Sequence, residues 1–157
     1  MEELMRRKDK EIKDIQQISR LIEKCRVCRI GMAKGQWPYI VPVSFGYDGQ
    51  AIFFHTAAQA GMKGAYLAAN NRVCFEFEYG VELAPDEQTP CGWSFRFQSV
   101  IGFGRVEELH SREAKVDGLA EIMAHYSDQS WDFAELPLHA LRVWKITIEE
   151  MSGKQSL

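Results

Sequence analysis

The segment that most constrains the fold is residues 93–109, WSFRFQSVIGFGRVEEL, the longest run of strand-like sequence in the chain. Two glycines, Gly102 and Gly104, stand in its middle. Paired glycines inside a strand mark a bend or a close approach of backbone, as at the corner of a barrel. This segment therefore predicts a strongly bent sheet.

Other segments have the alternation or the β-branched and aromatic content of strands. Residues 72–79, RVCFEFEY, place Val73, Phe75 and Phe77 on one face. Asp48-Gly49 predicts a tight hairpin between two further strands. Pro42 removes one ladder donor and indicates an edge, a bulge, or a place where something other than a strand pairs. The remaining predicted strands are residues 27–32, 39–47, 51–55 and 141–148. Residues 80–92 are expected to form a long polar loop.

Three segments have helical spacing of apolar residues, namely 9–25, 60–69 and 111–126. Asp9 and Ser111 are the expected N-caps of the first and third helices. Six strands and three helices predict a mainly β, α+β fold, a six-stranded antiparallel barrel with flanking helices, in one domain over residues 1–157.

Composition excludes several classes of protein. With 46% hydrophobic and 26% charged residues the chain is neither disordered nor fibrous. The net charge of −3 disfavours a nucleic-acid partner. No run approaches the roughly 18 apolar residues of a membrane span. The charged start has no apolar stretch behind it, which predicts a cytoplasmic protein with no membrane partner.

Four cysteines are present, and Cys25 and Cys28 form a CxxC pair. A zinc site needs a second close pair, which Cys74 and Cys91 do not supply, so no metal site is predicted. The favoured interpretation is that the cysteines are core or incidental residues, with redox or metal use as the alternative.

The stretch 54–63, FHTAAQAGMK, joins the end of a strand to the start of a helix. Helix-start N–H groups, the Thr56 hydroxyl and the Lys63 ammonium together favour a phosphate. The alternative is an ordinary turn with an exposed lysine. His55 is either a half-buried histidine bonded to the backbone or a catalytic group. Trp93 and Arg96 either cover a planar ligand or belong to ordinary strand packing.

No phosphate-binding loop of the GxxxxGK type, GxGxxG, HExxH or GxSxG motif occurs. The ordered set of segments nevertheless resembles the pyridoxamine 5′-phosphate oxidase-like FMN-binding split barrels, and within them the 5-nitroimidazole-resistance (Nim) proteins. The segments that carry the resemblance are MRRKDKEI near the start, PYIVPVSFGYDG at 38–49, IFFHTAAQAGMKGAYLAANNRVCFEFE at 52–78, WSFRFQSVIGFGRVEEL at 93–109 and VWKITIEEMSGK ending at 154.

The resemblance implies a split β-barrel that binds FMN, with its site residues on three segments. The strand matching VPVSFGY would run along the flavin ring, the stretch matching FHTAAQAGMK would hold the phosphate, and the strand matching SVIGFG would line the site. The residues so implied are Pro42, Val43, Ser44, Phe54, His55, Thr56, Lys63, Ser99 and Val100.

The resemblance also implies a homodimer with flavin at the interface, in which Trp93 or Arg96 would serve the partner's site. One departure is notable, because Ala58 and Met62 stand where Nim-type sequences often carry basic residues. Lys63 would then hold the phosphate charge alone, which leaves FAD open as the alternative to FMN.

The function implied is a flavin-dependent oxidoreductase, nitroreductase-like, that reduces a small molecule such as a nitroimidazole-type nitro compound. The flavin would carry the redox chemistry, and His55 is the candidate catalytic residue. The alternative is a non-catalytic flavin- or haem-binding protein of the same fold, with His55 as an axial ligand. Pyridoxamine phosphate oxidation is a third hypothesis, disfavoured by the short chain and the lack of a basic C-terminal tail.

Overall fold

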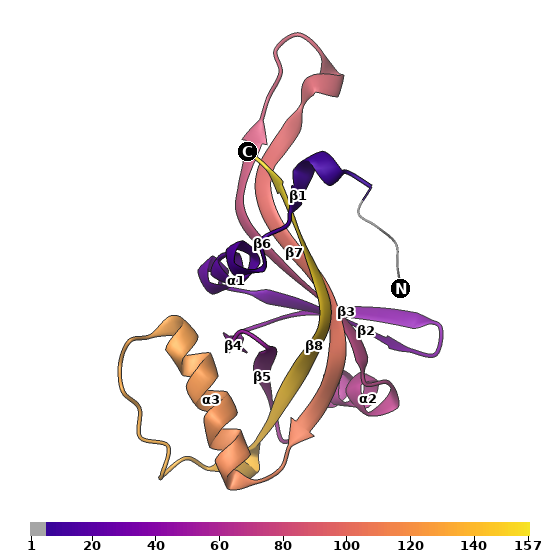
Figure 1. Cartoon of the computed structure of the whole chain (residues 1–157). Coiled ribbons are helices and arrows are strands. Elements are labelled where there is room, and N and C mark those ends of the chain that lie inside the picture. The colour runs from indigo at the N-terminus through magenta and orange to yellow at the C-terminus, as the bar shows by residue number, and fades with distance from the viewer. Residues whose placement is uncertain (1–5) are drawn as a thin grey trace.

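The long strand β7, Ser94–Leu109, lies at the centre of a single antiparallel sheet in the computed structural model, which describes residues 6–157. The first five residues, including the start of the charged N-terminal segment and Met5 of MRRKDKEI, lie outside the described residues. The strand order is β3-β2-β6-β7-β8-β5-β4, and β1 pairs with β8 (Figure 1). The other strands are β1 (Glu11–Ile12), β2 (Cys28–Lys34), β3 (Trp37–Val43), β4 (Gly46–Tyr47), β5 (Ala51–Ala57), β6 (Arg72–Ala84) and β8 (Leu141–Ser156).

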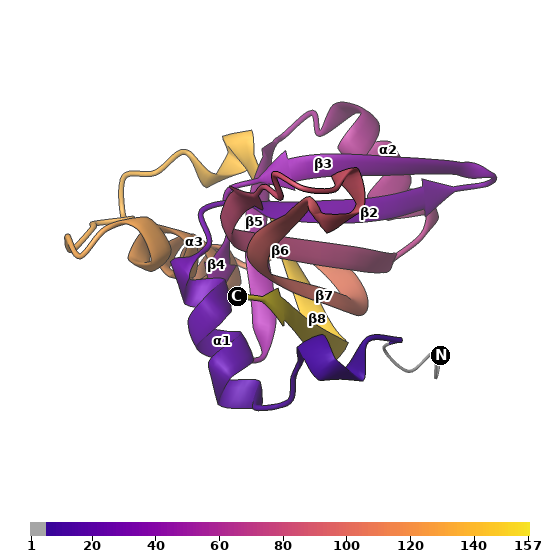
Figure 2. The same cartoon turned by 90° about the horizontal axis from the view of Figure 1, so that it is seen from above.

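The sheet has eight strands where six were predicted, since β1 and β4 are two-residue strands and six strands are longer. It curves into a split β-barrel, with the helices outside it (Figure 2). The helices are α1 (Ile15–Lys24), α2 (Gly61–Ala69) and α3 (Arg112–Tyr126). Short 3-10 turns are η1 (Lys8–Lys10), η2 (Pro90–Gly92) and η3 (Leu138–Ala140). No helix in the described part of the chain is long and apolar enough to cross a membrane.

The two glycines of β7 serve as the sequence predicted. A Cβ at Gly102 would collide with the ring of Phe75, and a Cβ at Gly104 would collide with the carbonyl oxygen of Thr147. The pairing of β7 with β8 also shifts register between Phe103 and Gly104. The bend and the close backbone approach are both confirmed.

The first helix is shorter than predicted, and its N-cap is different. The side chain of Asp14 accepts a hydrogen bond from the Gln16 amide, whereas Asp9 lies in η1 and pairs with Arg7. Ile12 continues the helical spacing of the apolar residues, but it pairs with Gly153 of β8 and is buried. Pairing with a distant strand therefore overrides the local helical pattern.

The predicted strand 39–47 is two strands in the structure. It breaks at Ser44 and Phe45, and β3 is an edge strand, which agrees with the expectation from Pro42. The hairpin at Asp48-Gly49 is confirmed: Gly49 has φ of 95°, and the Asp48 carboxylate accepts hydrogen bonds from two amides beyond it.

The predicted loop 80–92 is shorter in the structure, because β6 extends through Ala84 and the loop proper is residues 85–92, which include the η2 turn. β6 continues past a register shift beside Gly80, whose φ is 63°, and Glu82 pairs with Arg96. The result is a hairpin arm, residues 79–98, that projects beyond the barrel (Figure 1). β8 is also longer than predicted, because its second half pairs with β7 as far as Ser156. The third helix agrees with its prediction, and Ser111 is its N-cap.

Two apolar clusters hold these elements together. The larger fills the barrel and includes Phe75, Phe77 and the buried face of α1, while the smaller packs α3 against the outside of β5 and β8. Cys25 and Cys28 belong to the larger cluster, which confirms them as core residues. Burial raises the pKa of Cys25 to about 11 and raises the pKa of Cys28 as well, so both thiols stay protonated.

Candidate functional site

Two strand edges lie open where β3 passes into β4. β3 has β2 as its only strand neighbour among the described residues, so its other edge carries unpaired backbone groups. β5 pairs with β8 along its full length, but on its other side it pairs, within residues 6–157, only with β4 at Ile52 and Phe53. Residues 54–57 therefore have a free edge too. Only Ser44 and Phe45 separate β3 from β4, so the two edges converge at this link.

Helix α2 follows β5 directly and reaches back to β3. Tyr66 of α2 packs against Tyr39 of β3, with 5.0 Å between the ring centroids. Leu67 on the same helix is buried in the barrel core. The helix thus joins the two strands whose edges are open, and it places its first turn beside the end of β5.

Two titratable side chains lie near this first turn, Lys63 and His55. Lys63 lies in it, half-buried, and Ala60 at the N-cap supplies no side-chain acceptor for the helix N–H groups. His55 is exposed on β5, and its pKa is lowered, first by partial burial and second by the positive charge of Lys63. The two side chains, eight positions apart in sequence, are therefore electrostatic neighbours.

The barrel wall beside α2, formed here by β5 and β8, contains a residue that the sequence analysis missed. Arg142 of β8 makes two hydrogen bonds to the Glu108 carboxylate, at 2.9 and 2.7 Å, and lies over the Trp144 ring at 4.5 Å. A Cβ at Gly64 of α2 would stand 3.2 Å from Nη1 of Arg142. A guanidinium is thus held against the start of α2. The alternation in LRVWKITI places Arg142 and Trp144 on one face of a strand, which was the available signal.

Phe54 and Thr56 point into this wall rather than outward. Phe54 stacks on Trp144 with 11° between the ring planes, and the Thr56 hydroxyl accepts a hydrogen bond from the Trp144 indole. Both residues are buried. Of the β5 candidates, His55 alone has an exposed side chain.

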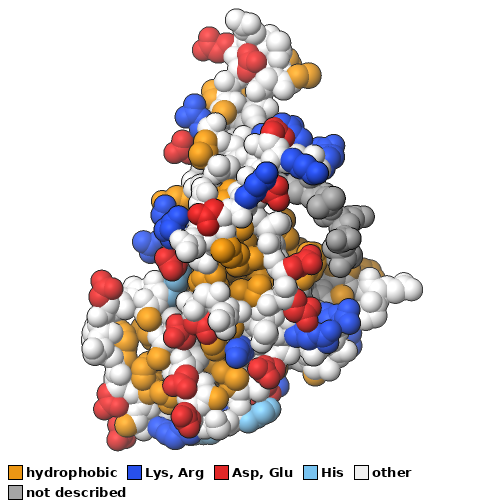
Figure 3. All heavy atoms as spheres, in the orientation of Figure 1, with side chains coloured by type: hydrophobic (Ala, Val, Ile, Leu, Met, Phe, Trp, Pro, Cys, Tyr) orange, Lys and Arg blue, Asp and Glu red, His pale blue; other side chains and the backbone are white. Residues whose placement is uncertain are grey.

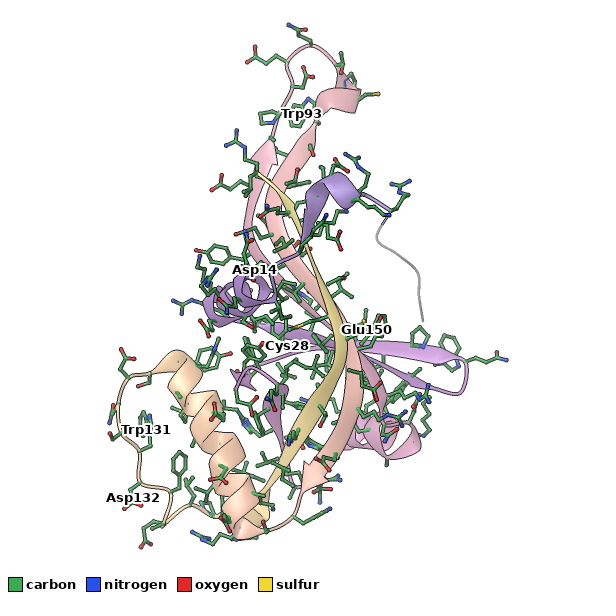
Figure 4. All side chains as sticks on the ribbon, in the orientation of Figure 1. Asp14, Cys28, Trp93, Trp131, Asp132 and Glu150 are labelled. Atoms are coloured by element: carbon green, nitrogen blue, oxygen red, sulfur yellow. The ribbon has the colours of Figure 1, made fainter. Side chains whose placement is uncertain are left out.

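The other candidates fall into two groups. Pro42 and Ser44 are exposed at the open edge, with Val43 buried between them. Val100 is fully buried in the core, and Ser99 beside it pairs with Lys154 of β8. Trp93 and Arg96 lie on the projecting arm, on the opposite side of the molecule from α2 (Figure 4). One protomer therefore brings together the β3, β5 and α2 candidates but not Trp93 or Arg96.

A groove of about 580 Å³ crosses the outer face of the sheet. Its apolar lining includes Ile40, Cys74 and Phe103, and Arg72 and Glu150 add charges of opposite sign. Ile40 is 67% exposed, and the neighbouring Trp37 is 75% exposed. Hydrophobic side chains also reach the surface along the arm, including Val81, Leu83, Trp93 and Phe95 (Figure 3). Sequence reasoning did not identify this face, because the groove joins five strands.

The fold and the open strand edges define a split-barrel protein. The pyridoxamine 5′-phosphate oxidase family model matches residues 14–155, and the chain belongs to that family.

Solved structures agree with this assignment. A candidate 5-nitroimidazole antibiotic resistance protein from Bacteroides thetaiotaomicron is 30% identical, with a TM-score of 0.81 over 92% of this chain and 85% of that one. The flavocytochrome Anf3 from Azotobacter vinelandii (18% identity, TM-score 0.81, 98% and 72% covered) shares the fold. So does the FAD and haem binding protein from Mycobacterium smegmatis (16%, 0.79, 94% and 73%). No match was found among curated proteins.

Proposed function

We propose that this protein is a flavin-dependent oxidoreductase that holds FMN at the open edges of β3 and β5 and reduces a small molecule. The observation that carries the proposal is the start of α2, where Lys63 and uncapped backbone N–H groups lie next to two unpaired strand edges, in a chain of this family. Nitroimidazole-type nitro compounds are the substrate class to test first, because the Bacteroides relative is described as a resistance protein against them.

The residues at the start of α2 fit the phosphate of a flavin nucleotide. Gly64 leaves room that a Cβ would fill, since that atom would lie 2.7 Å from Ala60 Cβ as well as near Arg142. Lys63 supplies a mobile cation, and the uncapped N–H groups of α2 favour an anion. Glu108 already pairs with Arg142. Lys63 is therefore the principal charge for the phosphate.

The open edges would orient the flavin ring. Unpaired N–H groups along the end of β3 can donate to ring carbonyl and nitrogen atoms, and the exposed Ser44 adds a hydroxyl. When bound, the flavin supplies the hydride-transfer chemistry, while the protein positions it and excludes competing reactions. Because the pKa of His55 is lowered, its ring is neutral at pH 7 and can exchange a proton with a bound molecule.

The absorption spectrum of the purified protein tests this proposal. We expect flavin bands in the visible range, FMN rather than FAD on release, and bleaching by a nicotinamide donor followed by recovery when a nitroimidazole is added. A protein that stays colourless and takes up neither flavin contradicts the proposal. A flavin that binds but does not turn over contradicts the enzymatic part alone.

We further propose that the flavin site is completed in a homodimer. The exposed Trp37 and Ile40 and the apolar groove form a face that water would otherwise cover, and Arg72 and Glu150 make it complementary to itself under a two-fold axis. A partner's arm is then the source of Trp93 and Arg96 at the site. Light scattering should give twice the monomer mass, and Ile40→Asp should give the monomer. A wild-type monomer contradicts this arrangement.

A second candidate function is haem binding without turnover. The exposed His55 presents a neutral imidazole, the form that ligates iron, and two neighbours of the same fold are described as a flavocytochrome and as an FAD and haem binding protein. Haem addition should then produce a Soret band that His55→Ala abolishes. A wild-type protein that gives no Soret band excludes this function.

A further inference from the structure

The link between β3 and β4 is held from outside the barrel by the C-terminal half of α3. Gly46 lies directly against the helix backbone, where a Cβ would collide with Glu121. The ring of His125 packs on the ring of Phe45 at 4.1 Å between centroids. The Phe45 amide donates to the hydroxyl of Tyr126 at 3.1 Å. Three successive contacts thus place α3 along Phe45 and Gly46.

The Tyr126 hydroxyl also reaches a second segment. It donates to the carbonyl oxygen of Arg26 at 2.8 Å, in the link between α1 and β2. His125 contacts Cys25, the residue before Arg26, with 2.6 Å between Nε2 and the Cys25 carbonyl oxygen. The end of α3 therefore ties the entry to β2 and the exit from β3, which are neighbouring strands, to one point.

The Phe45 amide depends on a side chain, the phenol of Tyr126, for its hydrogen bond. The Phe45 amide follows the end of β3 and has no strand partner in the described part of the chain, and Tyr126 supplies its acceptor. Burial raises the pKa of this phenol, and the Phe45 amide and then the Ser44 hydroxyl act in the opposite direction. The position of Ser44 and Phe45 is thus set by a side chain 81 residues away in sequence.

We propose that Tyr126 is a positioning residue that fixes the path of Ser44 and Phe45, and with it the open end of β3 that binds the flavin ring. The flavin part of this inference rests on the function proposed above. Tyr126 itself touches no flavin in this account. Its effect is transmitted through the Phe45 amide, which holds the strand exit in one conformation before the ligand arrives.

The test compares two tyrosine variants of the full chain. Tyr126→Phe removes the acceptor of the Phe45 amide and keeps the ring. Tyr47→Phe is the matched control, because the hydroxyl of this β4 residue contacts Ser19 at 2.9 Å and the Gly49 carbonyl at 3.3 Å, and neither contact involves Ser44 or Phe45. Hydrogen exchange at the Phe45 amide is measured without flavin. FMN affinity is measured by fluorescence, and the melting temperature is recorded for both variants.

We expect faster exchange at Phe45 in Tyr126→Phe alone, and FMN binding weakened about 5- to 10-fold, the effect of one lost hydrogen bond. Tyr47→Phe should bind FMN like the wild type despite a comparable loss of melting temperature. Unchanged Phe45 exchange in Tyr126→Phe overturns the inference whether or not flavin binds. Faster exchange with wild-type FMN affinity overturns the link to the flavin. A wild type that binds no flavin overturns the proposed function, while the exchange result still decides the role of Tyr126.

Discussion

The indole N–H of Trp144 donates to the hydroxyl oxygen of Thr56, with 3.1 Å between Nε1 and Oγ1. Both side chains are 4% exposed, and they join β8 to β5 across the barrel wall. A residue expected at a phosphate site on sequence grounds thus has a second role in the wall. The bond supports Trp144, which in turn lies beneath Arg142.

Replacement of Thr56 by valine should destabilise the protein. The change keeps the side-chain shape but leaves the buried indole N–H of Trp144 without an acceptor, which costs about 1–3 kcal/mol. Urea unfolding at fixed protein concentration measures the loss. Thr56→Ser keeps the hydroxyl and serves as the control. A valine variant as stable as the serine variant would show that the bond contributes nothing.

Gly46→Ala should destabilise the fold, because the added methyl group meets the backbone of α3 and the helix must shift. Overpacking of this kind costs about 1–3 kcal/mol. Gly31→Ala is the matched control, since a Cβ there has its nearest neighbour, Cys74 Cβ, at an ordinary 3.6 Å. Thermal unfolding of the two variants gives the comparison. Equal melting temperatures would mean that α3 does not press on β4.

Lys63→Ala should weaken FMN binding by about 1.5–3 kcal/mol, the worth of a charge-assisted hydrogen bond to phosphate. Lys34→Ala, at the exposed end of β2, is the control for a general change of charge. Calorimetric titration with FMN measures both. If Lys63→Ala retains wild-type affinity, Lys63 does not bind the phosphate.

The pKa of His55 should rise when Lys63 is replaced by glutamine. Two effects lower this pKa, burial first and the Lys63 charge second, so removal of the charge should recover part of the shift. Because the folded pKa lies below the unfolded value, the unfolded chain binds more protons between the two values. The contribution of His55 to stability is therefore fully present above pH 6.5 and is lost as the pH drops towards the folded pKa.

An NMR titration of the His55 ring in the wild type, Lys63→Gln and Lys34→Gln measures this effect. Lys34 lies at the end of β2 and does not act on the pKa of His55. A pKa of His55 that is the same in all three proteins would show that the charge of Lys63 does not act on His55.

Local chemistry predicted several elements correctly. Ser111 caps α3 because its hydroxyl needs only the amide of Ala114, three residues on. Asp48 and Gly49 form their turn for the same kind of reason, since the carboxylate bonds amides two and three residues away. These interactions are complete within a few residues, so the sequence contains all their partners in order.

Predictions failed where a distant partner decided the outcome. Ile12 has the spacing of a helix residue but pairs with Gly153. The expected loop at 80–92 begins as strand, as far as Ala84, because Glu82 pairs with Arg96 beyond a register shift. Strand pairing gains free energy from backbone bonds whose partners no local pattern reveals.

The sequence by itself determined the split-barrel family, the bend at Gly102 and Gly104, and the strand–turn–helix segment that carries His55 and Lys63. Only the tertiary structure decided what surrounds that segment. It placed Arg142 and Glu108 against α2, turned Thr56 towards Trp144, and brought Tyr126 to the Phe45 amide. Bends, caps and turns depend on neighbours along the chain, whereas an arrangement of charges and hydrogen bonds between four elements exists only after the sheet has closed around its core.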